Sequence, residues 1–147
     1  IISSKTVFLN LIEKYPNTDF AIDAKFKLDL INDILAAKEM YVGRYYFSKK
    51  KWISAINRFR TVTDDYDTTI YVEEALHRLV EIYYIIGLDE EAKKYANLLG
   101  YNYNSSEWYK KTYSIFDKMY YKNKIIAKKS KKKSILDKFK SLFNWDE

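Results

Sequence analysis

Residues that could perform acid–base or metal chemistry are few in this chain of 147 residues. It contains one histidine, His77, and no cysteine, so thiolate nucleophiles, disulfides and cysteine metal sites are excluded. It has no glycine-rich phosphate loop, no serine elbow and no paired histidines at metal-binding spacing. A lone histidine on a helix is far more often a surface or groove residue than a general base. We therefore expect no enzyme activity, no cofactor and no metal.

Three acidic pairs could in principle supply paired carboxylates. They are Asp64-Asp65, Glu73-Glu74 and Glu90-Glu91. Each pair stands at the expected end or start of a helix, where an acidic residue in the first turn interacts favourably with the helix dipole. A structural role is sufficient to explain them.

Arg58 offers a different chemistry, the recognition of a partner. It directly precedes Phe59, an expected core residue, so its side chain lies on the flank of its helix. From there the guanidinium fork could bind a partner carboxylate through two hydrogen bonds. The alternative is an intramolecular pair with Asp64, Asp65 or Glu74, which on a surface would contribute little stability.

Charge is unevenly distributed along the chain. Residues 1–121 contain 17 Lys/Arg and 17 Asp/Glu, whereas residues 122–147 contain 9 Lys and 3 acidic residues, the whole net charge of +6. A neutral body whose aromatic residues follow helical spacing lacks the basic footprint of a nucleic-acid-binding protein, so we expect no nucleic-acid partner.

The basic amphipathic C-terminal tail, residues 122–147, has two interpretations. The simpler one is a helix docked on the end of the body, or a segment disordered in solution. The other is contact with an anionic membrane surface, because six lysines within residues 124–133 and a terminal amphipathic stretch suit such a surface. The candidate membrane-surface residues are Lys128, Lys129, Lys131, Lys132, Lys133 and Trp145.

The elements that must position these residues are helices, because three Gly and one Pro are too few for the turns of a sheet protein. Three segments align on a recurring turn tyrosine, Tyr15, Tyr66 and Tyr103, spaced 51 and then 37 residues apart. Each tyrosine ends an amphipathic helix and precedes an Asn, Ser or Thr that can cap the next. The second spacing is close to the period of about 34 residues of the tetratricopeptide repeat (TPR), a helix pair that buries its apolar face by stacking on neighbours. The sequence therefore predicts an all-α TPR helical solenoid.

Small residues support two full repeats. A repeat counted from residue 36 places Gly43 and Ala55 where helices cross closely, and Phe59 where a gap is filled. A repeat counted from residue 73 places Ala92 at a small position, but Val80 where a smaller residue is usual. We expect the solenoid to occupy residues 1–121, with a partial repeat, an inserted helix, the two full repeats and a capping helix after Ser105.

The groove of such a solenoid is lined by the first helix of each repeat. In the first full repeat these positions are Ala37, Met40, Arg44 and Phe47, mostly apolar, and we expect the inserted helix at 19–35 to cover them. That segment could instead continue into the next helix. In the second full repeat the positions are Glu74, His77, Glu81 and Tyr84, polar enough for an open groove that binds a partner.

One run of residues goes beyond a generic repeat. Leu35 to Phe59, LAAKEMYVGRYYFSKKKWISAINRF, contains a Tyr45-Tyr46 pair, Trp52 and an Asn57-Arg58 pair in an order that resembles the BamD/ComL lipoproteins. The resemblance covers roughly residues 7–109. Asp67 and Asn104 replace the family's turn proline. This difference hardly weakens the resemblance, because Asp and Asn also form turns. The basic tail matches nothing in the family.

The resemblance implies a non-catalytic scaffold of the outer-membrane β-barrel assembly machinery. Such a protein lies at the periplasmic face of the outer membrane, lipid-anchored through an N-terminus that this chain would lack. It holds a POTRA domain of the BamA-type barrel protein through its C-terminal repeats, with Asn57 and Arg58 on the matching surface. Unfolded barrel proteins are engaged mainly by N-terminal repeats, and other lipoproteins of the machinery are further possible partners.

Two other functions stay open at this stage. The chain could be another TPR adaptor or co-chaperone, or a membrane-surface binder that acts through its tail. No apolar run reaches the roughly 18 to 20 residues that span a bilayer.

Overall fold

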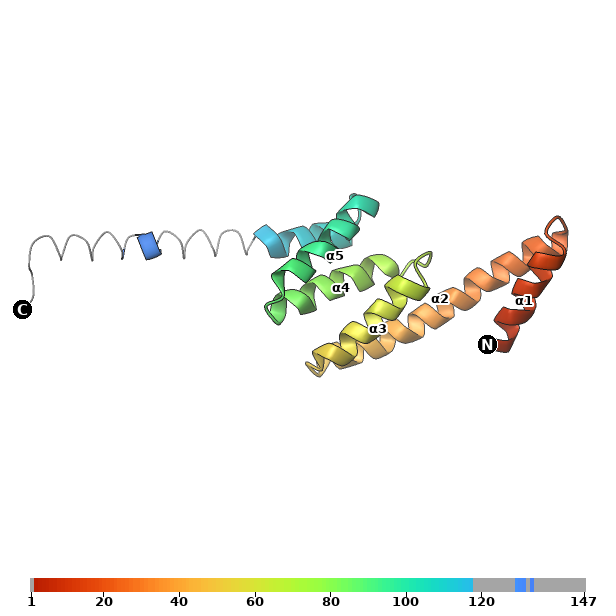
Figure 1. The fold of residues 1–147 in the computed structure, drawn as a ribbon, viewed down its shortest axis with the longest axis horizontal. Helices are drawn as coiled ribbons and strands as arrows, with labels where there is room; N and C mark the ends of the chain where they lie inside the picture. Colours follow the sequence, from red (N-terminus) through yellow and green to blue (C-terminus); the bar gives the residue numbers. More distant parts are fainter. Residues whose placement is uncertain (1, 118–128, 132, 134–147) are drawn as a thin grey trace, which may run out of the picture.

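The computed structural model describes residues 2–117, 129–131 and 133. Its helices are α1 (Ile2–Lys14), α2 (Asp19–Ser48), α3 (Trp52–Asp65), α4 (Val72–Ile85) and α5 (Asp89–Asn102). Residues 107–117 are helical as well, and the described part contains no strand. Successive helices pack antiparallel along the chain (Figure 1). The all-α helical-repeat architecture is confirmed.

The three turn tyrosines occupy equivalent turns, as their alignment predicts. The amide N–H of Tyr15, Tyr66 and Tyr103 each donates to the carbonyl oxygen four residues earlier, at 3.0, 3.2 and 2.8 Å. Each tyrosine carbonyl oxygen then accepts the N–H three residues later, at 3.3, 3.1 and 3.1 Å. The same backbone turn therefore ends α1, α3 and α5.

The expected helix caps form in two of these three turns. The Thr18 hydroxyl accepts the N–H of Ala21 at the start of α2, and the Ser106 hydroxyl accepts the N–H of Tyr109 in the helix of residues 107–117. In the middle turn Thr69 instead donates its hydroxyl to the Tyr66 carbonyl oxygen, and α4 begins without a side-chain cap. A cap of this kind satisfies one of the free N–H groups at a helix start.

Two further turns, between α2 and α3 and between α4 and α5, are also equivalent. In both, three successive N–H groups bond back to carbonyl oxygens of the preceding helix. The middle bond runs from Lys50 to Phe47 in the first turn and from Gly87 to Tyr84, 37 residues on, in the second. Both turns need a left-handed residue, with φ of 57° at Lys50 and 80° at Gly87. Glycine adopts this conformation without steric cost, whereas lysine does not.

The inserted helix at 19–35 is continuous with the helix that follows it. Together they form the 30-residue α2. The join is built of Leu35, Ala36 and Ala37, which are strong helix formers, and no glycine or proline interrupts it. The expectation that this segment covers Ala37, Met40, Arg44 and Phe47 is therefore wrong, because one straight helix cannot fold back on itself.

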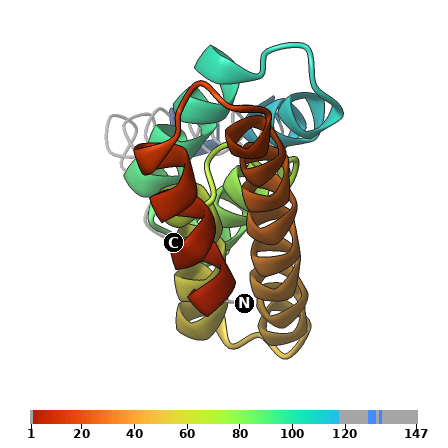
Figure 2. The same ribbon diagram turned by 90° about the vertical axis from the view of Figure 1, so that its right-hand side faces the viewer.

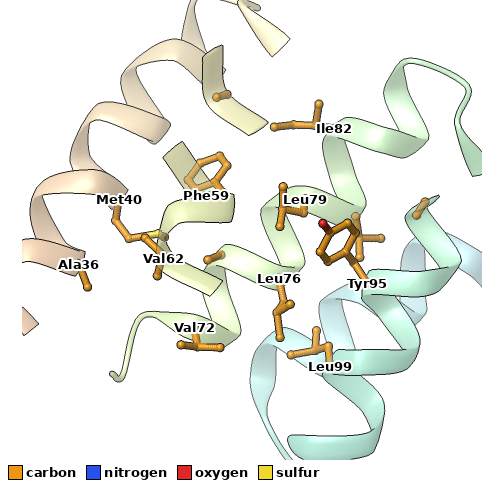
Figure 3. Close-up of a cluster of buried hydrophobic side chains, with 14 residues drawn as sticks. Ala36, Met40, Phe59, Val62, Val72, Leu76, Leu79, Ile82, Tyr95 and Leu99 are labelled. Atoms are coloured by element: carbon orange, nitrogen blue, oxygen red, sulfur yellow. The ribbon is translucent and has the colours of Figure 1, made fainter. Parts of the chain in front are cut away.

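α1 and α3 lie on the same side of α2 (Figure 2), one beside each half of that helix (Figure 1). The Lys5 ammonium of α1 donates to the Asn32 side chain at 3.1 Å and lies 5.8 Å from the centre of the Tyr66 ring, which follows α3. Several large apolar side chains along α2 are exposed: Ile22, Phe26, Leu30 and Ile34. The buried core lies instead between α2, α3, α4 and α5 (Figure 3).

The close helix crossings fall at the predicted small residues. Ala55 and Ala92 are fully buried. A Cβ atom at Gly43 would lie 2.6 Å from the Phe59 ring, so only glycine fits there without movement of that ring. The equivalent positions of the next repeat are Val80 on α4 and Ala96 on α5. Here the larger residue is on the first helix of the repeat, whereas in the Gly43–Phe59 pair it is on the second. The departure at Val80 is thus balanced by a smaller residue across the crossing.

Candidate partner-binding surface

Arg58 lies on α3 with its side chain 45% exposed. Its Nη1 donates to Oε2 of Glu39 on α2 at 3.0 Å, and the Glu39 side chain is only 16% exposed. Arg58 therefore does form an intramolecular pair, but the expected partners Asp64, Asp65 and Glu74 are wrong. The partner is Glu39, because α3 runs antiparallel to α2 and their crossing brings Glu39 within reach. The pair uses a single N–H of the guanidinium fork.

A polar recess opens beside this ion pair, between α2 and α3. It measures about 330 Å³ and is lined by Tyr46, Ser54, Asn57, Arg58 and Thr61. Thr61 donates its hydroxyl to the Asn57 carbonyl oxygen at 3.0 Å. Within the described residues, the Tyr46 and Ser54 hydroxyls and the Asn57 amide have no hydrogen-bond partner. The recess therefore presents donors that an acceptor from outside could use.

The second candidate surface, the groove of Glu74, His77, Glu81 and Tyr84, is largely closed. His77 is 4% exposed because residues 107–117 pack across α4. Its Nδ1 lies 2.8 Å from the Thr112 hydroxyl, and its ring centre lies 5.2 Å from that of Trp108. The expectation of an open groove is wrong at His77, since the helix that follows α5 stacks on α4 as the first helix of a further repeat would.

The two glutamates of this groove are held in ion pairs. Arg44 of α2 binds Glu74 through both arms of its fork, with Nε to Oε1 at 2.9 Å and Nη2 to Oε2. Arg78 donates Nη1 to Glu81 at 2.7 Å, and His77 Nε2 lies 3.6 Å from the same carboxylate. The Arg44–Glu74 pair joins α2 to α4, whereas the contacts of Glu81 lie within α4.

Arg78 is the centre of this closed network. Its guanidinium lies 5.3 Å from the centre of the Phe47 ring on α2 and 5.8 Å from that of Trp108. Its Nε lies 3.5 Å from Glu74 Oε1 without forming a hydrogen bond. A guanidinium between two aromatic faces is a favourable cation–π arrangement. Arg78, on α4, therefore links α4 to α2 and to the helix of residues 107–117.

The carboxyl groups of this network are held ionised. Burial raises the pKa of Glu74, but the hydrogen bond and charge of Arg44, with those of Arg78, outweigh burial and hold that pKa below its usual value. At Glu81 burial also raises the pKa, but the neighbouring His77 ring and the hydrogen bond from Arg78 outweigh burial and hold that pKa below its usual value. Both side chains are therefore anionic at neutral pH.

The remaining predicted residues lie elsewhere. Tyr84 is half-buried on α4. Lys129, Lys131 and Lys133 are exposed on a helical stretch, whereas Lys128, Lys132 and Trp145 lie outside the described residues.

Sequence reasoning missed three residues that complete these contacts, Glu39, Arg78 and Thr112, and named Arg44 only as a groove position. Each is an ordinary polar residue at a helical position, and only the packing of the helices brings it to its partner. Glu39 and Arg44 both lie within the run that resembles the family.

The described residues contain no group of three or more His, Cys, Asp or Glu side chains that could hold a metal ion. No helix among them is long and apolar enough to cross a membrane.

The stacked helix pairs, the repeated turns and a polar recess on the helix surface define a helical-repeat protein of the TPR type. A family model described as an outer membrane lipoprotein, YfiO, matches residues 1–99. The chain belongs to this family, and the resemblance to BamD/ComL lipoproteins is confirmed.

Relatives from three bacteria carry the name outer membrane protein assembly factor BamD. The chain is 54% identical over 112 residues to that of Rickettsia prowazekii, which covers 76% of this chain and 45% of that protein. It is 44% identical over 108 residues to that of Caulobacter vibrioides, covering 74% of this chain and 35% of the relative. It is 33% identical over 99 residues to that of Neisseria meningitidis serogroup A, covering 67% of this chain and 37% of the relative. The chain thus spans less than half the length of these relatives.

Proposed function

We propose that this chain is a non-catalytic scaffold of the outer-membrane β-barrel assembly machinery, which holds a POTRA domain of the BamA-type barrel protein. Membership of the family and the names of the relatives support the role in assembly. The proposed location is the periplasmic face of the outer membrane, with a lipid anchor at the N-terminus of the natural protein. Contact with other lipoproteins, and binding of unfolded barrel proteins by repeats nearer that N-terminus, stay predictions.

The observation that carries the partner site is the polar recess at Arg58. The Arg58 side chain is nearly half exposed, uses one N–H on Glu39, and stands beside Asn57, whose amide has no partner in the described chain. An arginine fork with free donors is a favoured anchor for a carboxylate in a protein interface. The groove of Glu74, His77, Glu81 and Tyr84 offers less, because its charges are already paired and His77 is covered.

Reversal of the charge at Arg58 tests this site. We expect Arg58→Glu to weaken binding of the cognate POTRA domain at least tenfold, or about 1.4 kcal/mol, in isothermal titration calorimetry. The thermal midpoint should change little, because a half-exposed ion pair contributes at most about 1 kcal/mol. Arg58→Gln should also weaken binding, which shows that the effect does not come from repulsion between two carboxylates at positions 39 and 58.

Arg60→Glu is the matched control. Arg60 lies on the same helix, is 52% exposed and pairs only loosely with Asp64 at 3.8 Å, so its reversal should leave the affinity within about threefold of wild type. If Arg58→Glu lowers stability and spares binding, Arg58 serves only its pair with Glu39. The interface must then be sought first at the groove of Glu74, His77, Glu81 and Tyr84.

The basic tail is the alternative site of action. Its net charge of +6 in residues 122–147 favours adsorption to anionic vesicles. A chain that ends at Tyr121 should lose salt-sensitive binding to phosphatidylglycerol vesicles and keep its affinity for the POTRA domain. Equal vesicle binding by the full and shortened chains would show that the tail is not the membrane-binding segment.

A further inference from the structure

Glu39 and Arg58 differ in burial in a way that separates their roles. The Glu39 side chain is 16% exposed and that of Arg58 is 45% exposed, so the carboxylate lies at the base of the pair and the guanidinium at the rim. Glu39 stands next to fully buried Met40 on α2, and Ala36, one turn earlier, is fully buried as well. The packing of α2 therefore fixes the backbone at Glu39, and the low exposure of the Glu39 side chain limits how far its carboxylate can move.

Arg58 needs such a fixed neighbour. An arginine side chain on a surface has many rotamers, and binding a partner immobilises it at a cost in entropy. One hydrogen bond to a carboxylate that does not move holds Nη1 in place. The fork is planar, so fixing one nitrogen limits the direction of the others.

We propose that Glu39 is a positioning residue, which holds the Arg58 fork so that its free N–H groups and the Asn57 amide receive one carboxylate of the partner. This rests on the proposed function of the recess. Glu39 and the partner carboxylate then bind different nitrogens of the same guanidinium. The Ser54 and Tyr46 hydroxyls, which line the recess without partners in the described chain, complete the set of donors.

Two substitutions at Glu39 separate positioning from charge. Glu39→Gln keeps an oxygen that accepts the Arg58 N–H and removes the negative charge, whereas Glu39→Ala removes both. We expect Glu39→Ala to weaken binding of the cognate POTRA domain at least fivefold, and Glu39→Gln to stay within about threefold of wild type. If both variants bind more tightly than wild type, Glu39 competes with the partner for Arg58 and the proposal is overturned.

A double-mutant cycle with Arg58→Ala distinguishes positioning from a general structural role. If Glu39 acts through Arg58, the double variant binds no more weakly than Arg58→Ala alone. Additive losses would overturn the proposal. Wild-type affinity in Arg58→Ala would overturn the proposed site itself, whereas weak binding in Arg58→Ala with wild-type affinity in Glu39→Ala would overturn the positioning role alone.

A measurement on the chain without a partner completes the test. The ¹⁵N relaxation of the Arg58 Nε–H group should report an ordered side chain in wild type and Glu39→Gln, and a mobile one in Glu39→Ala. Arg60 is the internal control, because its pair with Asp64 does not involve Glu39. An Arg58 side chain as ordered in Glu39→Ala as in wild type would contradict the proposal whatever the binding data show.

Discussion

Arg58 and Glu39 lie 19 residues apart in the chain and meet across two antiparallel helices. The sequence could place Arg58 on the flank of its helix, because Phe59 marks the buried stripe. It could not identify Glu39 as the partner, because the sequence alone allowed Arg58 to pair with any of several carboxylates. The same limit applies to His77: its helix and its polar neighbours were predictable, but not its burial under Trp108 and Thr112.

The ion pair of Glu74 with Arg44 makes the free energy of unfolding depend on pH in the acid range. The pKa of Glu74 is lowered in the folded chain, so its contribution is complete above the usual carboxyl pKa and is lost as the pH falls through the lowered value. We expect Glu74→Gln to cost about 1 kcal/mol at pH 7. The thermal midpoints of the variant and wild type, measured from pH 7 to pH 3, should converge at the acid end.

Glu90→Gln is the control for that titration. The Glu90 side chain is 87% exposed and pairs with Lys93 on the surface, so its loss should shift the midpoint little at any pH. If the thermal midpoints of Glu74→Gln and wild type differ by the same amount down to pH 3, the pair of Glu74 with Arg44 does not cause the loss of stability in acid.

Among the helices, the repeat register was the most predictable feature. The turn tyrosines align in the sequence because each ends a helix with the same backbone bonds, and local sequence determines such turns. The continuity of α2 was left open, because the join at 35–37 contains helix formers and no boundary signal. Which surface α2 would cover depended on that continuity, so the prediction of a covered groove failed with it.

The crossing of Gly43 with Phe59 predicts coupled effects on stability. Gly43→Val should cost about 1–3 kcal/mol by overpacking, and Phe59→Ala about 3–5 kcal/mol through the cavity it leaves. The double variant reproduces the Val80–Ala96 pair of the next repeat, so its cost should be at least about 1 kcal/mol less than the sum. Urea denaturation measures all three. Strictly additive costs would show that the two crossings are not equivalent.

At the scale of the whole molecule, the all-α fold and the family followed from the sequence, whereas the shape of the proposed partner surface did not. The recess at Arg58 is built from two helices whose contact depends on the packing of α2 with α3. Helix position and the family resemblance indicated Arg58 as the leading candidate, and the groove of Glu74, His77, Glu81 and Tyr84 as the second. Packing then closed one of them and left the other with free donors.

Site-specific photo-crosslinking tests the proposed interface most directly. A photoreactive amino acid at Thr61, which lines the recess but is not one of the proposed donors, should crosslink the full chain to the cognate POTRA domain. The same amino acid at Tyr84, in the groove, or at Tyr101, 88% exposed on α5, should not. We predict a crosslink from position 61 that Arg58→Glu abolishes. Crosslinks from position 84 or 101 with none from position 61 would contradict the proposed interface.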